Sequence, residues 1–143
     1  MSSFTSISSL LRSPVSEAQV ALRGWIYRTR SSGKIVFAVV RDSTGIMQVT
    51  IKKGNLPDPQ FEGAVSASIE SSVEVTGTMH QDGRAPGGYE VRATSFTIIG
   101  SALPFPITEY QSEELLLANR HLWIRSREQT AVMKVKAALM AGA

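Results

Sequence analysis

The sequence predicts a mainly β domain, because five apolar segments alternate with turns and one helix-spaced segment lies between the third and the fourth of them. The chain has 143 residues, of which 43% are hydrophobic and 19% are charged, the composition of a single globular domain. Short turns join the first three strands. Three strands, a helix and two strands form the order of a five-stranded OB barrel, and a C-terminal helix follows. A small SH3-type barrel without the helix is the alternative.

The first two strands are joined by a tight turn. Residues 18–30 are typical of a strand, in which Gly24 indicates a β-bulge or the close approach of another backbone. The turn at 31–33 consists of two serines and a glycine. Residues 34–42 form a nearly continuous apolar run, and we therefore expect a strand buried on both faces.

The second half of the predicted barrel contains the helix. Residues 45–53 alternate between polar and apolar side chains, which indicates a half-buried strand. Residues 57–71 place apolar residues at helical spacing after Pro57, and proline suits a first helical turn. Two further strands are expected at 72–79 and 89–99, with a glycine-rich loop between them.

Further segments are predicted on both sides of the barrel, which is assigned to residues 18–103. Residues 1–17 are an N-terminal extension whose serine-rich start fits a targeting peptide but whose apolar spacing favours a short capping helix. Residues 104–126 are a hinge, because their prolines cannot continue a strand. Residues 127–143 form an amphipathic helix. Its predicted apolar face consists of Ala131, Val132, Val135, Ala138 and Leu139.

Composition excludes several kinds of chemistry. The absence of cysteine excludes disulfides and thiolate metal sites and fits a cytosolic protein. His80, expected in a solvated loop, and His121 are too few for a three-ligand zinc site. No glycine-rich phosphate loop is present, and Asp42 is interpreted as a turn cap. No segment has the roughly 20 apolar residues of a membrane helix. We therefore expect a binding function, with no metal or cofactor held by this chain.

Positive charge gathers in two parts of the sequence. Residues 1–53 carry a net charge of +6, residues 54–114 carry −7 and residues 115–143 carry +4, within a total of +3. Such blocks mark either a phosphate-binding face or a solvated surface.

Polar side chains share one side of three predicted strands. In an OB barrel, nucleic acid lies across this side of the sheet. Phe37, on the second strand, belongs either to the core or to this surface, where a base would stack on its ring. Gln48 can both donate to and accept from a base edge, and arginines contact phosphates. The residues of common parity are Ile26, Arg28 and Arg30 on the first strand, Gln48, Thr50 and Lys52 on the third, and Glu90, Arg92 and Thr94 on the last.

The run GWIYRTRSSGKIVFAVVRDSTGIMQV, residues 24–49, resembles the N-terminal domain of the class IIb aminoacyl-tRNA synthetases, which are the aspartyl, asparaginyl and lysyl enzymes. RAPGGYEV at 84–91 and PFPITEYQSEELLLANRHLWIRS at 104–126 are most similar to asparaginyl enzymes of the archaeal type. One departure is Ala118, where the family usually has aspartate before Asn-Arg-His-Leu. The resemblance covers residues 7–141.

This resemblance implies an OB fold that binds the anticodon loop of a tRNA. It implies that the middle uridine stacks on Phe37 and contacts Gln48, that Glu90 takes part in anticodon reading, and that Arg28 and Arg30 lie against the loop. The candidate nucleic-acid-binding residues are completed by the cations Lys34, Lys52 and Arg92.

The resemblance also implies a longer enzyme. Family members activate the amino acid with ATP and Mg²⁺ on a class II catalytic domain, through which they form homodimers, and its motifs are absent from these residues. We therefore expect this chain to select tRNA without aminoacylating it, as part of a cytoplasmic ligase, and its last helix to be the first of a truncated catalytic domain. The alternatives are an aspartyl enzyme that accepts one or both tRNAs, a free-standing single-strand-binding protein, and a protein-interaction fragment.

Overall fold

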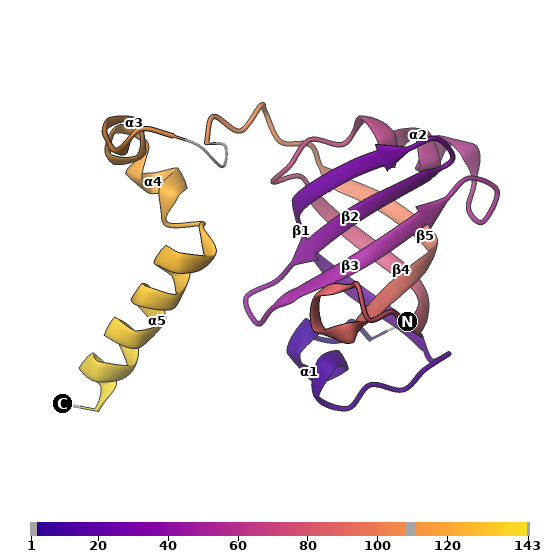
Figure 1. Ribbon diagram of the computed structural model, residues 1–143, viewed down its shortest axis with the longest axis horizontal. Helices are drawn as coiled ribbons and strands as arrows, with labels where there is room; N and C mark the ends of the chain where they lie inside the picture. The colour runs from indigo at the N-terminus through magenta and orange to yellow at the C-terminus, as the bar shows by residue number, and fades with distance from the viewer. Residues whose placement is uncertain (1–2, 108–110, 143) are drawn as a thin grey trace. The chain divides into compact units, whose positions relative to one another are not determined.

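The first part of the chain forms a closed five-stranded β-barrel with strand order β1-β2-β3-β5-β4 (Figure 1). The structure is a computed structural model that describes residues 3–107 and 111–142. The chain divides into the units Met1–Pro104 and Phe105–Ala143. The predicted OB-type barrel, with a helix between the third and fourth strands, is confirmed. Its elements are β1 (Gln19–Ser32), β2 (Ile35–Arg41), β3 (Ile46–Lys52), α2 (Asp58–Ser66), β4 (Ser72–Gln81) and β5 (Tyr89–Gly100).

The barrel core is built from alternate residues of each strand. Each strand of a closed barrel has one inward and one outward face, so β2 is not buried on both faces as its composition suggests. Its outward residues Ile35, Phe37 and Val39 are half-buried. The inward residues of β2 and β3 are Val36, Ala38, Val40, Met47, Val49 and Ile51, each at most 1% exposed.

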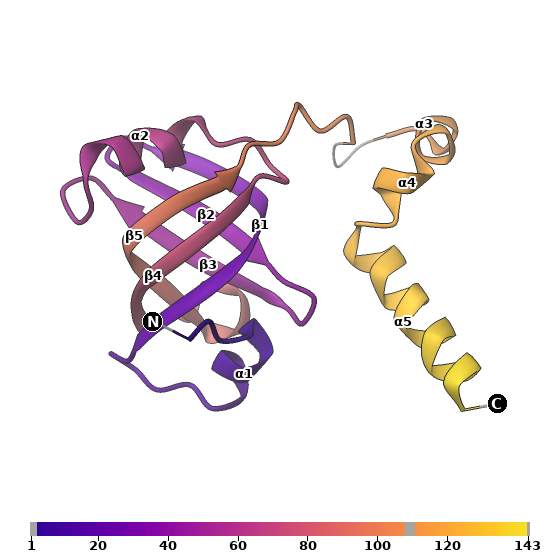
Figure 2. The ribbon, with the colours of Figure 1, turned by 180° about the vertical axis from the view of Figure 1, so that it is seen from behind.

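Two helices cover the ends of the barrel (Figure 2). Helix α1 (Ile7–Arg12) is the capping helix expected near the N-terminus, and its Ile7 is fully buried in the barrel core. Helix α2 buries Phe61 and Ala64 at the other end. The Gln60 side-chain oxygen accepts a hydrogen bond of 2.9 Å from the Phe96 N–H, which ties α2 to β5.

The Asp42 carboxylate holds α1 in place from the β2–β3 turn. It accepts hydrogen bonds from the Ile7 N–H at 2.8 Å and, within its own turn, from the N–H groups of Thr44 and Gly45. Burial would raise the pKa of the Asp42 carboxyl, but these hydrogen bonds and one from the Thr44 hydroxyl outweigh it and hold the pKa below its ordinary value of 3.8. The predicted turn cap is therefore also the cap of a helix 35 residues away.

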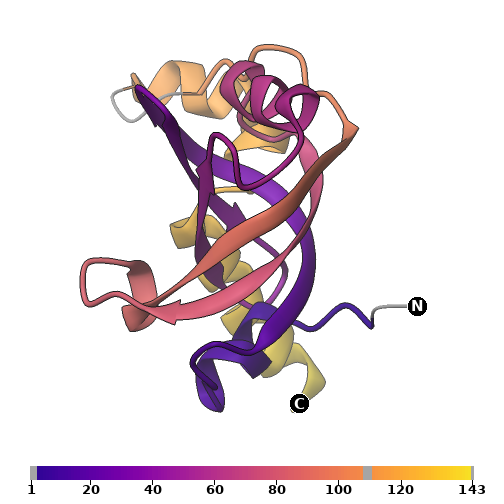
Figure 3. The same cartoon turned by 90° about the vertical axis from the view of Figure 1, so that its right-hand side faces the viewer.

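Two glycines permit close approach between strands. A Cβ on Gly24 would meet the carbonyl oxygen of Arg41, and a Cβ on Gly77 would meet that of Arg92. The close approach predicted at Gly24 is therefore present, whereas the bulge of β1 lies after Ile26. Between β4 and β5, residues 82–88 form a loop that ends in the 3₁₀ helix η1 (Pro86–Gly88) and projects from the barrel (Figure 3).

The second unit contains three helices in its described residues, α3 (Glu113–Ala118), α4 (Arg120–Trp123) and α5 (Arg127–Ala141). The hydroxyls of Ser112 and Ser126 cap α3 and α5. The predicted apolar face of α5 is exposed, to 69% at Leu139. Residues 108–110 of the predicted hinge lie outside the described residues, and the hinge and catalytic-helix assignments stay predictions. Within the part of the chain that is described, no helix has the length and apolarity needed to span a bilayer.

We expect Asp42→Ala to lower the free energy of unfolding at pH 7 by about 1–2 kcal/mol, the usual cost of a lost helix cap. Because the folded-state pKa of Asp42 lies below 3.8, its contribution is complete above that pH and is lost as the pH falls further. Urea unfolding at pH 7 and pH 3 measures the difference in the free energy of unfolding between variant and parent. The exposed Glu62→Gln is the control, and a difference that stays constant with pH would contradict this role.

Gly77→Ala should destabilise the barrel by about 2–3 kcal/mol, because the added methyl group overlaps the β5 backbone at Arg92. The matched control is Gly83→Ala, since a Cβ at that position meets no atom within 4 Å. Urea unfolding curves of the two variants give the comparison, and equal midpoints would show that β5 moves away without cost.

Candidate nucleic-acid interface

The pairing register places six of the eight candidate residues in two adjacent rows across the outer surface of the barrel. The first row runs through Arg30 on β1, Phe37 on β2, Thr50 on β3 and Arg92 on β5. The second row runs through Arg28, Val39, Gln48 and Glu90 on the same strands. The other two candidates lie at the edge of this surface, Lys34 in the β1–β2 turn and Lys52 at the end of β3.

A bulge in β1 decides which of its side chains reach this surface. Ile26 pairs with Val40 and Arg28 pairs with Val39, so Tyr27 is an extra residue in β1. The extra residue reverses the alternation. The prediction that Ile26 shares the polar face with Arg28 and Arg30 is therefore wrong for Ile26, which is 1% exposed and belongs to the core.

The half-buried Phe37 lies beside an exposed arginine. The Arg30 guanidinium carbon lies 4.5 Å from the centroid of the Phe37 ring, a cation–π contact. The two residues are direct partners in the β1–β2 register. The planar Arg30 guanidinium therefore covers one face of this ring. Phe37 is half-buried on the outer surface, so it does not occupy the core position that was the alternative.

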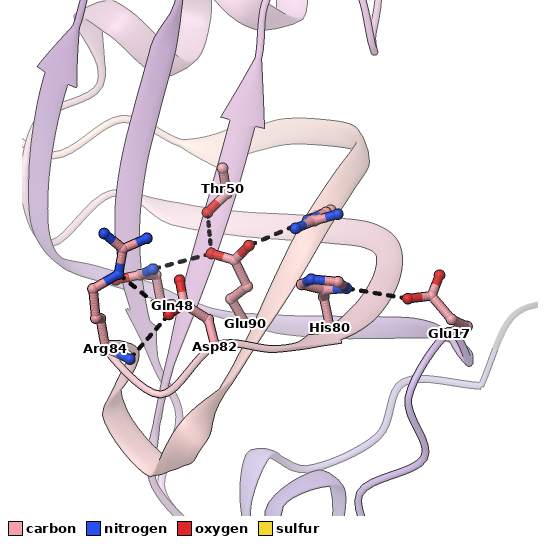
Figure 4. Close-up of polar contacts among 8 residues, drawn as sticks. Glu17, Gln48, Thr50, His80, Asp82, Arg84 and Glu90 are labelled. Atoms are coloured by element: carbon pink, nitrogen blue, oxygen red, sulfur yellow. Dashed lines mark hydrogen bonds and ion pairs between the residues drawn. The ribbon is translucent and has the colours of Figure 1, made fainter.

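The Glu90 carboxylate is the centre of a hydrogen-bond network on β3 and β5 (Figure 4). Its Oε2 accepts from the Thr50 hydroxyl at 2.6 Å and from Gln48 Nε2 at 3.1 Å, and its Oε1 accepts from Arg92 Nε at 3.3 Å. Glu90 is only 5% exposed, so this buried carboxylate is compensated by three donors. Periodicity within β5 predicted an outward Glu90 but contained no sign of this burial.

The charge around the two rows is positive. Five exposed cations lie in the two rows or at their edge, and one of them, Arg92, contacts the buried Glu90 and has a side chain that is 54% exposed. A surface with half-buried apolar groups and surrounding cations suits a ligand that combines flat rings with phosphates. Sequence reasoning did not assign the half-buried Ile35 and Val39 to this surface, although the continuous apolar run of β2 was the signal for them. The five cations are Arg28, Arg30, Lys34, Lys52 and Arg92.

Outside the two rows, the described histidine His80 pairs with an acidic side chain. His80 lies on β4 rather than in a loop, because β4 continues to Gln81, and its Nδ1 is 3.1 Å from a Glu17 carboxylate oxygen (Figure 4). Among the residues that the structure describes, no group of three or more histidine or acidic side chains is arranged to hold a metal ion.

Comparison with known proteins identifies the barrel. The family model of the OB-fold nucleic acid binding domain, of the tRNA anticodon type, matches residues 20–99. This match covers the strands that carry both rows and the loops between them.

Curated relatives cover most of this chain. An asparagine–tRNA ligase of Thermoplasma acidophilum is 50% identical over 122 residues, which are 85% of this chain and 28% of that protein. An asparagine–tRNA ligase of Thermococcus kodakarensis is 47% identical over 125 residues, which are 87% of this chain and 29% of that protein. The chain thus spans less than a third of the length of these relatives.

Solved structures give the same result. The asparaginyl-tRNA synthetase of Pyrococcus horikoshii superimposes with a TM-score of 0.87 at 39% identity, over 99% of this chain and 34% of that one. An aspartyl-tRNA synthetase of Entamoeba histolytica superimposes with a TM-score of 0.81, over 97% of this chain and 36% of that one. The latter is 18% identical and is evidence of the shared fold alone.

Proposed function

Because the chain belongs to the tRNA anticodon family of OB-fold nucleic acid binding domains, we propose that its barrel binds the anticodon loop of an asparagine tRNA. The names of its relatives at 50% and 47% identity support asparagine over aspartate as the amino acid. The chain then serves as the tRNA-selecting part of an asparagine–tRNA ligase.

One observation carries this proposal, namely that Phe37 and Gln48 lie on adjacent strands in adjacent rows of the same outer surface. A base stacked on the ring of Phe37 would present its edge toward β3, where the amide of Gln48 both donates and accepts. A planar base would take the face of the ring that the Arg30 guanidinium covers. Arg30 would then be displaced toward the phosphates.

The exposed cations supply the second half of the proposed contact. Arg28 and Arg30 lie on β1, Lys34 lies in the adjacent turn, and Lys52 and Arg92 lie on β3 and β5. Of these, Arg30 contacts the Phe37 ring directly, and the others lie on the same outer surface or at its edge. We propose that they neutralise phosphates of the loop, which adds affinity without selecting a base.

We propose that the reaction of the complete ligase is carried out by a catalytic domain of a longer protein. We propose that ATP and Mg²⁺ serve the catalytic domain of the longer protein, that this protein is a homodimer, and that it works in the cytoplasm. The described residues contain no cluster that suits a metal ion, and the sequence has no glycine-rich phosphate loop.

We expect Phe37→Ala to weaken binding of the asparagine anticodon stem-loop by about 1–3 kcal/mol, roughly 5- to 150-fold, because one stacked base loses its platform. Fluorescence anisotropy measures the dissociation constant. Phe37→Tyr keeps the ring and should bind within about threefold of the parent. Unchanged affinity of a folded Phe37→Ala variant would rule out Phe37 as the platform.

The chain should bind the asparagine stem-loop at least about tenfold more tightly than an unrelated loop of the same length, the scale of one base contact. The aspartate stem-loop, which differs in the third anticodon letter, tests the amino-acid specificity. Equal affinity for the asparagine and aspartate loops would indicate a domain that accepts both tRNAs. Equal affinity for all three, with steep dependence on salt, would instead indicate a sequence-independent single-strand binder.

A further inference from the structure

We propose that Glu90 is a positioning residue that fixes the orientation of the Gln48 side-chain amide, and that this makes the interface discriminate uracil from cytosine at the base stacked on Phe37. The inference rests on the proposed function, because it concerns which base the same surface selects. It differs from the role that the family resemblance implies for Glu90, since Glu90 here acts through Gln48 and not by its own contact with RNA.

Three donors of this chain already bind the Glu90 carboxylate. Thr50 and Gln48 donate to one oxygen and Arg92 donates to the other, and the residue is 5% exposed. An ionised carboxylate accepts hydrogen bonds and donates none. Because three donors are already bound and little of its surface is exposed, Glu90 has less capacity to hydrogen-bond an incoming base than the neighbouring Gln48 amide has.

The same carboxylate determines which way the Gln48 amide points. The oxygen and the nitrogen of a terminal amide have nearly the same size, so a half-turn about the last side-chain bond exchanges them at little steric cost. Only one of the two orientations places Nε2 at 3.1 Å from Glu90 Oε2, as observed. The other orientation would place two acceptor oxygens face to face. The carbonyl oxygen of Gln48 is therefore held on the side away from Glu90.

The fixed amide presents one order of acceptor and donor to a base. The bond to Glu90 uses one of the two hydrogens on Nε2 and leaves the other, together with the carbonyl oxygen, for a base. Uracil and cytosine have the same ring shape, but uracil has an N3–H donor next to the O4 acceptor, whereas cytosine has the N3 acceptor next to an amino donor. A freely turning amide would pair with either base. A fixed amide pairs with one and leaves the other with unpaired polar groups.

Thr50 keeps the carboxylate in this position. Its hydroxyl makes the shortest of the three hydrogen bonds, at 2.6 Å, and it donates to the same oxygen that accepts from Gln48. Thr50 also pairs directly with Phe37 and with Arg92 across the sheet. The β2–β3 pairing that holds Phe37 in place thus also holds Thr50, the residue that orients Glu90.

The test measures the dissociation constants of two stem-loops that differ only by U or C at the middle anticodon base. The parent should prefer U by about tenfold or more. Glu90→Met has similar length and no acceptor, so the amide of Gln48 can turn, and we expect the C/U ratio of dissociation constants to fall below about twofold. The C/U ratio of Glu90→Gln should lie between those of the parent and Glu90→Met. The ratio is the proper readout, because loss of a negative charge strengthens binding of both loops alike.

Thr50 and two matched controls complete the series. Thr50→Val removes the hydroxyl and should reduce the ratio, whereas Thr50→Ser keeps the hydroxyl and should restore it. Glu74→Gln and Thr97→Val make the same chemical changes at residues that pair with each other on β4 and β5, and both should retain the ratio of the parent.

The outcomes separate the inference from the proposed function. A parent that prefers U, together with a folded Glu90→Met variant whose ratio stays within twofold of it, would overturn the positioning role. A parent that binds neither stem-loop would overturn the proposed function and the specificity that rests on it. The orientation itself is tested without RNA by the side-chain amide NMR signals of Gln48. These should show one hydrogen-bonded proton in the parent and in Glu74→Gln, but not in Glu90→Met, and their absence in the parent would contradict the fixed amide.

Discussion

The candidate interface depends on the parallel pairing of β3 with β5, which closes the barrel. In this register Val49 lies opposite Val91, and both are fully buried. The flanking pairs, Gln48 with Glu90 and Thr50 with Arg92, point outward. A shift of β5 by one residue would turn Val91 to solvent and would turn Glu90 and Arg92 toward the core. Packing of the core therefore sets the alignment that brings Glu90 to Gln48, although 42 residues separate them along the chain.

Most of the fold could be predicted, because it follows from patterns within single segments. The alternation of residues 45–53, the helical spacing after Pro57 and the turn residues each report on a local structure. The burial of β2 on both faces was mispredicted for a physical reason. Apolar residues at 35, 37 and 39 look the same in sequence whether they meet a second layer or a ligand surface, and only the closed barrel places them, half-buried, on its outer face.

The site could be predicted in part. Parity correctly placed Gln48, Thr50 and Arg92 on the outer face, because β3 and this part of β5 are regular. It failed at Ile26, because one extra residue at Tyr27 reverses the alternation of β1. The burial of Glu90 could not be predicted either. It depends on donors from another strand, and the periodicity of β5 does not indicate which strand lies beside it.

The burial of Ile7 has a consequence for the order of events during synthesis. Helix α1 is made before the barrel, yet its Ile7 needs the barrel core and its N–H needs Asp42, which is made 35 residues later. Strand β3 likewise waits for β5, which ends at Gly100. Contacts this distant in sequence form late. An emerging chain that lacks β5 therefore exposes unpaired apolar strands, a state open to aggregation. Helix α1, although it is made before these strands, is among the last of these elements to dock.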